Sequence, residues 1–345
     1  MSYLSFIPKP HDLTDTLKCG SKGATEQIIE DSLLLPLRDF LNRPSKKFRQ
    51  ELVFLACQMA VPDSKQKSGT YENKIKCELG AQTVEAIHSA SLIVDDIEDG
   101  SLIRRGHPTL HIQYGIPLAL NAGNWLYFWS LMKISHLKLE SDKESALLRD
   151  TIDIMLKAHI GQSIDIGICV DKIPQELVKE VCLSSISLKT GALMSLAMRV
   201  GGYIGGASSE RIESLAQIGS TMGALLQTFD DIGNFSRSNL MSNSKNPKQY
   251  EDLILRRPSW IWAFASSEFN YEDYRQFILL VNKLPEVGPL LNWLERNDFV
   301  SRAKKSANLD LLNWTMEIQN IFAFENPLGV QGLLKLAEEM ARSYG

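Results

Sequence analysis

The sequence predicts an all-α protein that folds as a single large helical bundle, and three observations support this fold class. Apolar residues recur at steps of three and four residues over long segments, as they do on the buried face of a helix. Strand-like alternation is missing over useful lengths, and Asp99-Gly100, a hairpin signal in other contexts, follows a helical pattern. Pro and Gly interrupt the apolar pattern at intervals that are typical of helix ends.

The expected helices follow one another without a long break. They span residues 24–42, 46–60, 72–99, 117–138, 142–168, 174–204, 208–236, 249–268, 271–281, 286–305, 308–322 and 329–343. Residues 236–248, rich in Ser, Asn and Lys, are expected to form a polar loop. Since no linker is evident, we expect one domain over residues 1–345, with helices 266–345 included. The segments 82–97 and 217–232 are apolar nearly all round and should lie centrally.

Composition favours a soluble globular protein with an ordinary core. Of the residues, 44% are hydrophobic and 23% are charged, and the formal net charge of −4 gives no basic field for nucleic acid. The five widely spaced cysteines lack metal-ligand spacing and fit a reducing, cytoplasmic setting. The N-terminus shows no secretory signal, and apolar runs such as 86–94 are shorter than the roughly 20 residues that span a bilayer. We therefore expect no nucleic-acid partner and no transmembrane segment.

Two acidic clusters stand at the ends of the two most apolar helices. The first contains Asp95, Asp96 and Asp99, and the second contains Asp230, Asp231 and Asn234. Side chains at i and i+4 share a helix face, so Asp95 lies beside Asp99, and Asp230 beside Asn234. Unpaired buried carboxylates are costly, and Mg²⁺ that also holds a phosphate takes such oxygens as ligands. Two clusters of this kind favour a metal–diphosphate site over solvated helix ends.

Basic residues that suit a diphosphate accompany these clusters. Arg104 and Arg105 follow the first cluster, and guanidinium groups bind phosphate oxygens in a bidentate way. The segment 45–49 supplies three further cations, and Lys189-Thr190 offers an ammonium and a hydroxyl within an apolar helix. Each set alone would indicate a solvated basic face. Their combination with two acidic clusters predicts a site for a small anionic substrate.

These motifs resemble those of the trans-isoprenyl diphosphate synthases, and most closely those of geranylgeranyl diphosphate synthases. The run SLIVDDIEDGSLIRRGHPTLHIQYGIP resembles the family's first aspartate-rich region with its paired arginines. GQSIDI (161–166), LKTGAL (188–193) and LLQTFDDIGN (225–234) follow in the family's order, and SKKFR (45–49) replaces its Gly-Lys-x-x-Arg element. The resemblance covers roughly residues 25–265. It implies the isoprenoid synthase bundle with a central cavity, a homodimer, and a Mg²⁺-dependent prenyltransferase that joins an allylic diphosphate to isopentenyl diphosphate.

The resemblance also implies a role for each matching residue. Mg²⁺, as three ions with the bound diphosphate, would be held by Asp95, Asp96, Asp99 and Asp230, with Asp231. The allylic diphosphate would be faced by Arg104, Lys189, Thr190, Gln227 and Arg257. Isopentenyl diphosphate would be bound by Lys46, Arg49, His88 and Arg105, and Gln162 and Asp165 would line the cavity. These groups would promote ionisation of the allylic diphosphate, attack by the isopentenyl double bond and loss of a proton, with water excluded.

The chain departs from the family pattern on the side of the second cluster. Phe229 stands where a basic or polar residue is usual, and Asn234 replaces a third Asp, as in eukaryotic-type geranylgeranyl synthases. Arg256-Arg257 stands where Gly-Lys is expected, and Pro247 falls at the position of an upstream lysine. Ser45 replaces a glycine near the isopentenyl pocket. Divergence of this chain is therefore expected on the Asp230 side.

Chain length is expected to depend on Ala90 and Ser91, which precede Asp95 by one to two helical turns. Both are small, whereas family members that stop at fifteen carbons tend to have aromatic residues there. Small side chains would leave room for a twenty-carbon product, geranylgeranyl diphosphate. The alternative is that they only permit close packing between helices.

Two other functions are compatible with the same motifs. A terpene cyclase, or a prenyltransferase with another acceptor, is favoured by Phe229, Arg256-Arg257 and the aromatic pair Trp260 and Trp262, since aromatic rings stabilise carbocations. The isopentenyl-binding set counts against a cyclase, which has no use for it. A non-catalytic partner subunit is disfavoured because five of the six cluster positions keep their aspartates.

Overall fold

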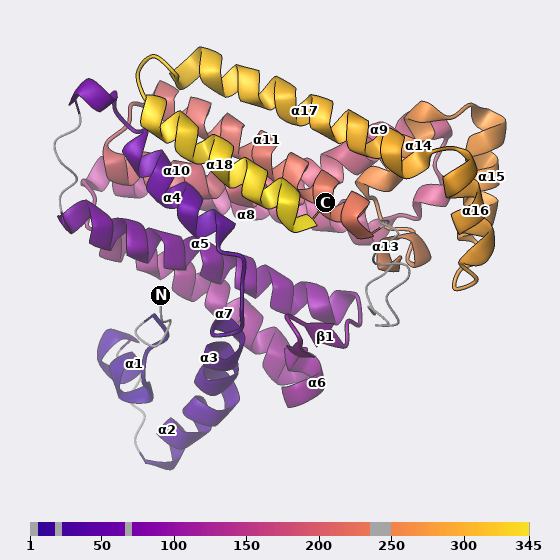
Figure 1. Cartoon of the computed structure of the whole chain (residues 1–345). Coiled ribbons are helices and arrows are strands. Elements are labelled where there is room, and N and C mark those ends of the chain that lie inside the picture. Colours follow the sequence, from indigo (N-terminus) through magenta and orange to yellow (C-terminus); the bar gives the residue numbers. More distant parts are fainter. Residues whose placement is uncertain (1–5, 18–22, 66–70, 235–249, 345) are drawn as a thin grey trace. The chain divides into compact units, whose positions relative to one another are not determined.

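The computed structural model is almost entirely helical (Figure 1), and the predicted all-α fold class is confirmed. It describes residues 6–17, 23–65, 71–234 and 250–344. The chain divides into two compact units. The first comprises Met1–Phe54 and Gly69–Leu148, and the second comprises Leu55–Ser68 and Arg149–Gly345.

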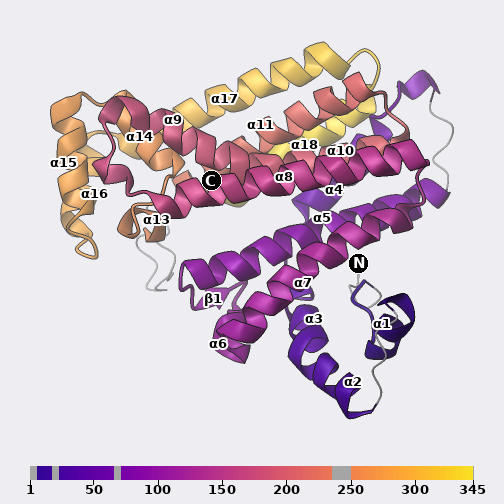
Figure 2. The same ribbon diagram turned by 180° about the vertical axis from the view of Figure 1, so that it is seen from behind.

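The first unit is built around two long helices that lie side by side. It contains α1 (Pro10–Leu17), α2 (Ala24–Ile29), the π-helical turn η2 (Glu30–Leu34), α3 (Leu35–Leu41), the start of α4 (Phe48–Gln58), α5 (Tyr71–Glu98), β1 (Ile103–Arg104), β2 (His107–Pro108), α6 (Leu110–Tyr114), α7 (Ile116–Ile134) and η4 (Ser135–Leu137). The helix α7 returns along α5 (Figures 1 and 2). Their backbones come close at Gly123, where an added Cβ would lie 3.1 Å from Val94 and 3.3 Å from Ile93.

The N-terminal segment is fastened to the far end of α7. Phe6 and Ile7 are buried, and the indole of Trp129 donates a hydrogen bond to the Phe6 carbonyl over 2.9 Å. Lys133 lies over the Trp129 ring, 4.5 Å from its centroid. Burial lowers the pKa of Lys133. These contacts hold Phe6 and Ile7 against α7.

The second unit has α11 at its centre. It contains η3 (Asp63–Lys65), most of α8 (Ser141–Gly167), η5 (Val170–Lys172), α9 (Gln175–Ile186), the π-helical turn η6 (Ser187–Gly191), α10 (Ala192–Gly205), α11 (Ser209–Asn234), α13 (Glu251–Ile254), α14 (Trp260–Glu268), α15 (Tyr271–Val281), α16 (Gly288–Arg296), α17 (Phe299–Phe322) and α18 (Pro327–Tyr344). The helices α10, α17 and α18 all pack on α11. Trp314 of α17 donates from its indole to the Ile218 carbonyl over 3.2 Å, which fixes α17 against this central helix.

An aromatic core joins α14 to α17. Trp262 is fully buried and meets Phe277 edge-on, with 5.2 Å between ring centroids. Phe299 stacks on Phe269 and lies edge-on to Phe264. Rings of this size bury a large apolar area. This cluster therefore explains why α14, α15 and α17 pack together, although the sequence analysis found no motif on them.

Helix boundaries agree with the sequence prediction except in three places. The predicted helix 249–268 is interrupted, since α13 ends at Ile254 and α14 begins at Trp260. The predicted boundary between 286–305 and 308–322 is wrong, because α17 runs unbroken from Phe299 and the break lies at Asp298, which has a left-handed φ of 47°. The helices α1 and α6 were not predicted, nor was the β1–β2 hairpin, in which Arg104 pairs with His107. The predicted loop 236–248 lies outside the described residues.

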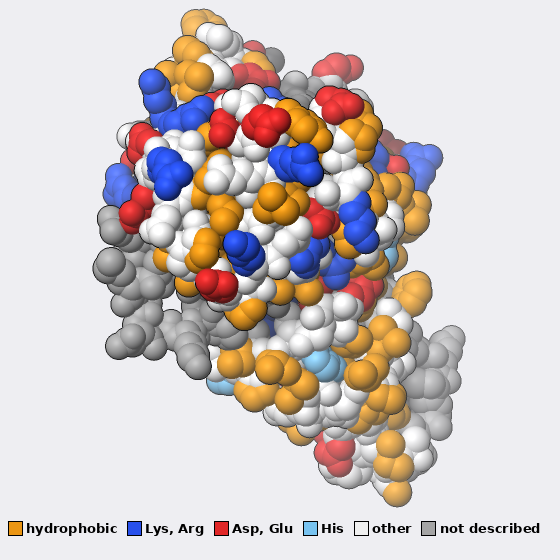
Figure 3. Space-filling view, turned by 90° about the vertical axis from the view of Figure 1, so that its right-hand side faces the viewer, with side chains coloured by type: hydrophobic (Ala, Val, Ile, Leu, Met, Phe, Trp, Pro, Cys, Tyr) orange, Lys and Arg blue, Asp and Glu red, His pale blue; other side chains and the backbone are white. Residues whose placement is uncertain are grey.

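Basic side chains are dispersed over one face of the protein (Figure 3), and one helical stretch is apolar enough to span a membrane. On the face in Figure 3, Lys and Arg side chains are interspersed with acidic and apolar ones rather than gathered in one patch. One helical stretch, Gln175–Gly205, has the length and apolar composition of a membrane span, and more than half of its most apolar part is buried inside the structure. Such burial is typical of a core helix, and the stretch carries η6 within it.

Candidate functional site

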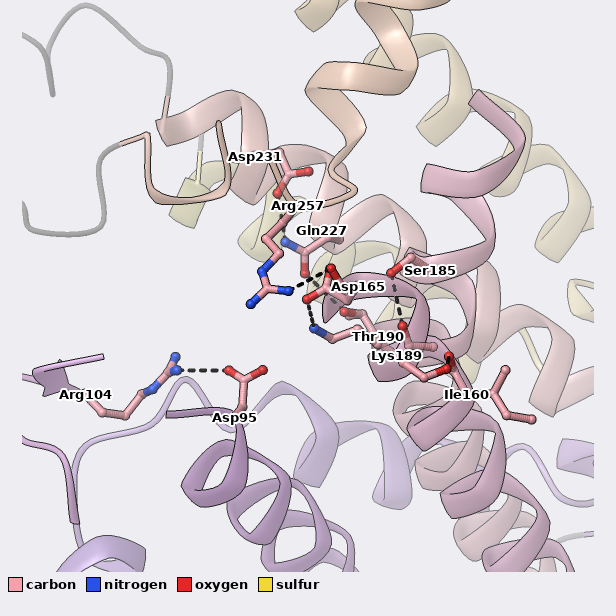
Figure 4. Close-up of polar contacts among 12 residues, drawn as sticks. Asp95, Arg104, Ile160, Asp165, Ser185, Lys189, Thr190, Gln227, Asp231 and Arg257 are labelled. Carbon is pink, nitrogen blue, oxygen red and sulfur yellow. Dashed lines mark hydrogen bonds and ion pairs between the residues drawn. The ribbon is translucent and has the colours of Figure 1, made fainter. Parts of the chain in front are cut away.

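The first acidic cluster ends α5, and two of its carboxylates are paired with Arg104. The Nε of Arg104 donates to Asp96 Oδ1 over 2.7 Å, and one of its terminal nitrogens lies 2.6 Å from that oxygen. The same nitrogen reaches Asp95 Oδ2 at 3.2 Å (Figure 4). Asp96 is only 1% exposed, whereas the Asp95 side chain is 22% exposed. The backbone amide of Asp99 donates to the Asp95 carbonyl over 2.9 Å, so Asp99 continues the helical turn, as the spacing predicted.

Arg105 belongs to a separate buried pair. It has a left-handed φ of 55°, next to Gly106 at 78°, and this turn sends the two neighbouring guanidinium groups to different acids. Arg105 donates to Glu85 over 3.1 Å and lies over the Phe40 ring, 5.6 Å from its centroid. Glu85 is nearly unexposed. Sequence reasoning missed Glu85, although a carboxylate inside an apolar helix segment was a usable signal.

His88 lies one turn beyond Glu85 on α5 and is surrounded by positive charge. Its pKa falls well below the ordinary value, because burial and then the charges of Arg49, Arg105 and Arg104 all disfavour the imidazolium. The ring is therefore neutral at pH 7 and can donate only one hydrogen bond. Lys46, the remaining member of the predicted isopentenyl set, is exposed at the start of α4.

The two predicted chain-length residues have different surroundings. Ala90 is fully buried, and its carbonyl lies 3.5 Å from the Cβ that would be added at Gly123 of α7. Ser91 is partly buried and donates its hydroxyl to the His88 carbonyl over 2.8 Å. Close packing explains the small side chain at Ala90, while it leaves the one at Ser91 unexplained.

In the second unit, Lys189 and Thr190 lie on the π-helical turn η6. Such turns replace the regular helical repeat over a few residues and occur frequently at functional sites. Glycines of the adjacent helices allow the close approach: a Cβ at Gly161 of α8 would lie 2.9 Å from the Lys189 amide, and one at Gly223 of α11 would lie 2.8 Å from the Thr190 carbonyl. The turn is thus held between two helices at backbone contact, which fixes where its side chains emerge.

Lys189 is paired with the acid that follows Gly161 on α8. Its Nζ donates to Asp165 Oδ2 over 2.8 Å, and the carbonyl of Asp165 accepts from Arg257 over 3.0 Å (Figure 4). Arg256 instead donates to Asn282 and lies 3.4 Å from Asp171. Of the two arginines that replace the family's Gly-Lys, only Arg257 therefore contacts a predicted site residue.

The side chains of the second acidic cluster differ in environment. Asp230 is partly buried. Asp231 is 2% exposed and accepts hydrogen bonds from Gln227 Nε2 at 2.8 Å and from the Trp260 amide at 2.7 Å. Burial, with the charges of Asp252 and Asp230, raises the pKa of Asp231 well above the ordinary value, although both hydrogen bonds act in the opposite direction. Gln227 in turn accepts from Thr190 Oγ1 over 3.1 Å.

Three aromatic residues that favoured the alternative function belong to the core. Phe229, Trp260 and Trp262 are all buried within the cluster of α9, α11 and α14–α17. Trp260 stacks on Phe264 with 5.0 Å between centroids. Their aromatic character is accounted for by packing.

The carboxylates fit a hard cation that shares its coordination with a substrate. Within the part of the chain that the structure describes, no three His, Cys, Asp or Glu side chains are gathered closely enough to hold a metal ion. Mg²⁺ commonly takes one or two carboxylates and completes its shell with water and substrate phosphate oxygens. Asp95 and Asp230, each partly accessible to solvent, are donors of that kind.

Comparison with known proteins identifies the relatives of this chain. Residues 30–286 match the sequence profile of the polyprenyl synthetase family. A short chain isoprenyl diphosphate synthase of Methanothermobacter thermautotrophicus is 29% identical over 64% of this chain and 66% of its own length. A geranylgeranyl pyrophosphate synthase of Clitopilus passeckerianus is 33% identical over 47% of this chain and 45% of its own length. A terpene synthase of Matsumurasca onukii is 29% identical over 66% of this chain and 67% of its own length.

The likeness extends to the fold of the whole chain. The structure of a geranylgeranyl pyrophosphate synthetase from Pyrococcus horikoshii superposes with a TM-score of 0.72, covering 99% of both chains at 21% identity. The sequence alignments with the first two curated relatives span less than two thirds of those proteins. The profile match, in contrast, covers most of this chain and includes all the motifs above. This chain belongs to the polyprenyl synthetase family.

Proposed function

We propose that this protein is a Mg²⁺-dependent trans-prenyltransferase that condenses an allylic diphosphate with isopentenyl diphosphate and releases geranylgeranyl diphosphate. The observation that carries the proposal is the pairing of acidic side chains with cations that can also bind phosphate. Arg104 lies on Asp95 and Asp96, and Lys189 lies on Asp165. The names of the relatives, a short chain isoprenyl and a geranylgeranyl synthase, support the reaction class.

We assign metal binding to Asp95, Asp99 and Asp230, with three ions on the bound diphosphate. Bound Mg²⁺ would supply Lewis-acid neutralisation of the leaving diphosphate. The exposure of Asp95 supports its role as a direct ligand. The nearly complete burial of Asp96 under Arg104 favours a supporting role for this second aspartate, in which it holds the guanidinium.

The cations of the second unit bind and stabilise the allylic diphosphate. The ammonium of Lys189 and the guanidinium of Arg257 are both oriented by Asp165, one by its carboxylate and one by its carbonyl. Preorganised charges of this kind stabilise a developing diphosphate anion without a reorganisation cost during the reaction. Thr190 and Gln227 lie beside these cations and are hydrogen-bonded to each other.

The set around His88 holds isopentenyl diphosphate. Lys46, Arg49 and Arg105 provide the positive charge. His88 is neutral because of its burial and, next, because of that charge, and it therefore contributes a directed hydrogen bond. Its neutrality also limits the net charge of the pocket.

The product, the assembly and the compartment are proposed on narrower observations. A twenty-carbon product is supported by Ser91, whose small side chain is not explained by packing. A homodimer is supported by Ile152, Leu156 and Ile160, which repeat every four residues along α8 and are 41%, 61% and 54% exposed. A cytoplasmic location is supported by the described cysteines, which are thiols rather than disulfides.

The reaction is tested by incubation with Mg²⁺, isopentenyl diphosphate and allylic diphosphates of five, ten and fifteen carbons. We expect an elongated diphosphate as the product. Asp95→Asn and Asp230→Asn should each abolish most of the turnover. Asp153→Asn is the matched control, since Asp153 pairs with Lys157 on the surface of α8 and is 61% exposed. Turnover that survives both cluster variants would contradict the assignment.

The second candidate is a terpene synthase that ionises the allylic diphosphate without using isopentenyl diphosphate. It is favoured by the relative from Matsumurasca onukii, which carries that name and is as similar as the short chain synthase. The buried positions of Trp260 and Trp262 give it no further support. Formation of a hydrocarbon or alcohol without elongation of the allylic chain, in the same incubation, would support the terpene synthase and contradict the chain-elongating prenyltransferase.

A further inference from the structure

The side chain of Asp231 links two parts of the second unit. One carboxylate oxygen accepts from the side-chain amide of Gln227 at 2.8 Å, and the other accepts from the backbone amide of Trp260 at 2.7 Å. The residue is 2% exposed. Figure 4 shows it above Gln227 and beside Arg257. A carboxylate enclosed in this way has a defined orientation.

On one side, Asp231 determines which way the Gln227 amide is turned. Because a carboxylate only accepts, Gln227 must direct its NH₂ toward Asp231. Its carbonyl oxygen then faces Thr190, whose hydroxyl donates to it over 3.1 Å. The hydroxyl hydrogen of Thr190 is thereby committed to Gln227, and the oxygen lone pairs and methyl group of Thr190 are held in one rotamer.

On the other side, Asp231 fixes the start of α14. Trp260 is the first residue of that helix, and the amides of a first helical turn have no partner within the helix. A carboxylate there also interacts favourably with the helix dipole. The segment 255–259, which includes Arg257, joins α14 at this point. Since Arg257 reaches the Asp165 carbonyl from there at 3.0 Å, the anchor at Trp260 sets the position from which its guanidinium extends.

We propose that Asp231 is a positioning residue rather than a Mg²⁺ ligand, and that it orients Thr190, Gln227 and Arg257 for the allylic diphosphate. The inference rests on the proposed function, since it concerns the same site. It separates the two neighbouring aspartates: Asp230 is partly accessible and binds metal, whereas Asp231 acts through its hydrogen bonds to Gln227 and Trp260.

The test compares Asp231→Asn with Asp231→Ala and Asp230→Asn. An asparagine keeps an oxygen for the Trp260 amide, and its NH₂ can donate to Gln227 once the glutamine amide turns over. A positioning role therefore predicts that Asp231→Asn keeps the parent's Mg²⁺ concentration for half-maximal activity. Because the Gln227 amide has turned, the KM of Asp231→Asn for the allylic diphosphate should still rise, though by less than in Asp231→Ala. Asp231→Ala loses both bonds, so its KM for the allylic diphosphate should rise about tenfold or more, the worth of one to two hydrogen bonds. Asp230→Asn should instead raise the Mg²⁺ concentration for half-maximal activity.

Hydrogen exchange provides a readout that does not depend on turnover. The amide of Trp260 should exchange faster in Asp231→Ala than in the parent protein and in Asp230→Asn, with thermal unfolding confirming that each variant is folded. Should Asp231→Ala fail to fold, Asp231→Asn alone decides the matter. A Mg²⁺ requirement in Asp231→Asn that rises as far as in Asp230→Asn would overturn the proposal.

Failure of the proposed function would look different. In that case the parent protein would form no elongated product, while the exchange rate of the Trp260 amide would still respond to Asp231→Ala. Unchanged exchange at Trp260 in Asp231→Ala would overturn the positioning role whatever reaction the protein catalyses.

Discussion

Replacing Arg104 by leucine tests how the first acidic cluster is kept stable. The substitution removes the charged partner that the structure shows on Asp96, a side chain that is 1% exposed and lies within 2.7 Å of the Arg104 Nε. Removal of one member of a buried ion pair costs about 3–5 kcal/mol, because the other charge is left in a medium that solvates it poorly. Asp95 adds little to this figure, since its side chain is 22% exposed and solvent screens its charge.

Protonation of Asp96 sets an upper limit on the loss. A carboxyl group with an ordinary pKa of about 3.9 is protonated at pH 7 at a cost of about 4 kcal/mol, and at pH 5.5 at a cost of about 2 kcal/mol. The variant can always take this route. The destabilisation of Arg104→Leu relative to the parent should therefore be about 3–4 kcal/mol at pH 7 and should fall to about 2 kcal/mol at pH 5.5.

The assay is urea unfolding of both proteins at the two pH values. Asp96→Asn combined with Arg104→Leu should recover most of the lost free energy of unfolding, since it removes the stranded charge. Arg342→Leu serves as the control, because its pair with Glu338 is exposed and should contribute little. A loss below about 1 kcal/mol at pH 7, or one that is the same at both pH values, would refute the reasoning.

Three further predictions concern chain length, pH dependence and packing. Ser91→Phe should shorten the product seen by chromatography of the dephosphorylated prenols, and unchanged product length would remove this role. Because the pKa of His88 is lowered on folding, the unfolded chain binds the proton more readily. Stability should therefore fall as pH drops below about 7, and His88→Gln should reduce that slope in thermal unfolding between pH 7.5 and 5.5. Gly205→Ala should lower the free energy of unfolding by about 1–3 kcal/mol, since its Cβ would lie 2.5 Å from the Cys57 carbonyl oxygen; Gly167→Ala, which meets nothing within 4 Å, is the control and should change it little.

The long helices were predictable from the sequence because their burial imposes a regular apolar repeat. The helices α5 and α11 agree with their predicted bounds within two residues. The break before α17 was not predictable in the same way, since no Pro or Gly marks it. It depends on Asp298, one of the residue types whose short polar side chain tolerates a left-handed backbone.

The candidate site was predictable as a set of residues but not as a set of contacts. The proximity of Asp95 and Arg104 was predictable because only nine positions separate them in the sequence. The pairing of Arg105 with Glu85 crosses 20 residues, and the sequence contains no local pattern that announces it. The different environments of Asp230 and Asp231 arise only when α14 packs on α11. The sequence shows two adjacent aspartates and does not indicate that only Asp231 is enclosed.

The turn η6, which packs against Gly161 and Gly223, affects which substitutions this protein tolerates. Lys189 and Thr190 can each be replaced without altering the backbone, so variants there should accumulate in cells as intact but impaired protein. A single methyl group at Gly161 or Gly223 would meet backbone atoms of 188–191 within 3.0 Å, and either variant should lose abundance and activity together. A mutational scan that measures both protein level and turnover would thus separate positions that affect only the reaction from positions that the protein needs in order to fold.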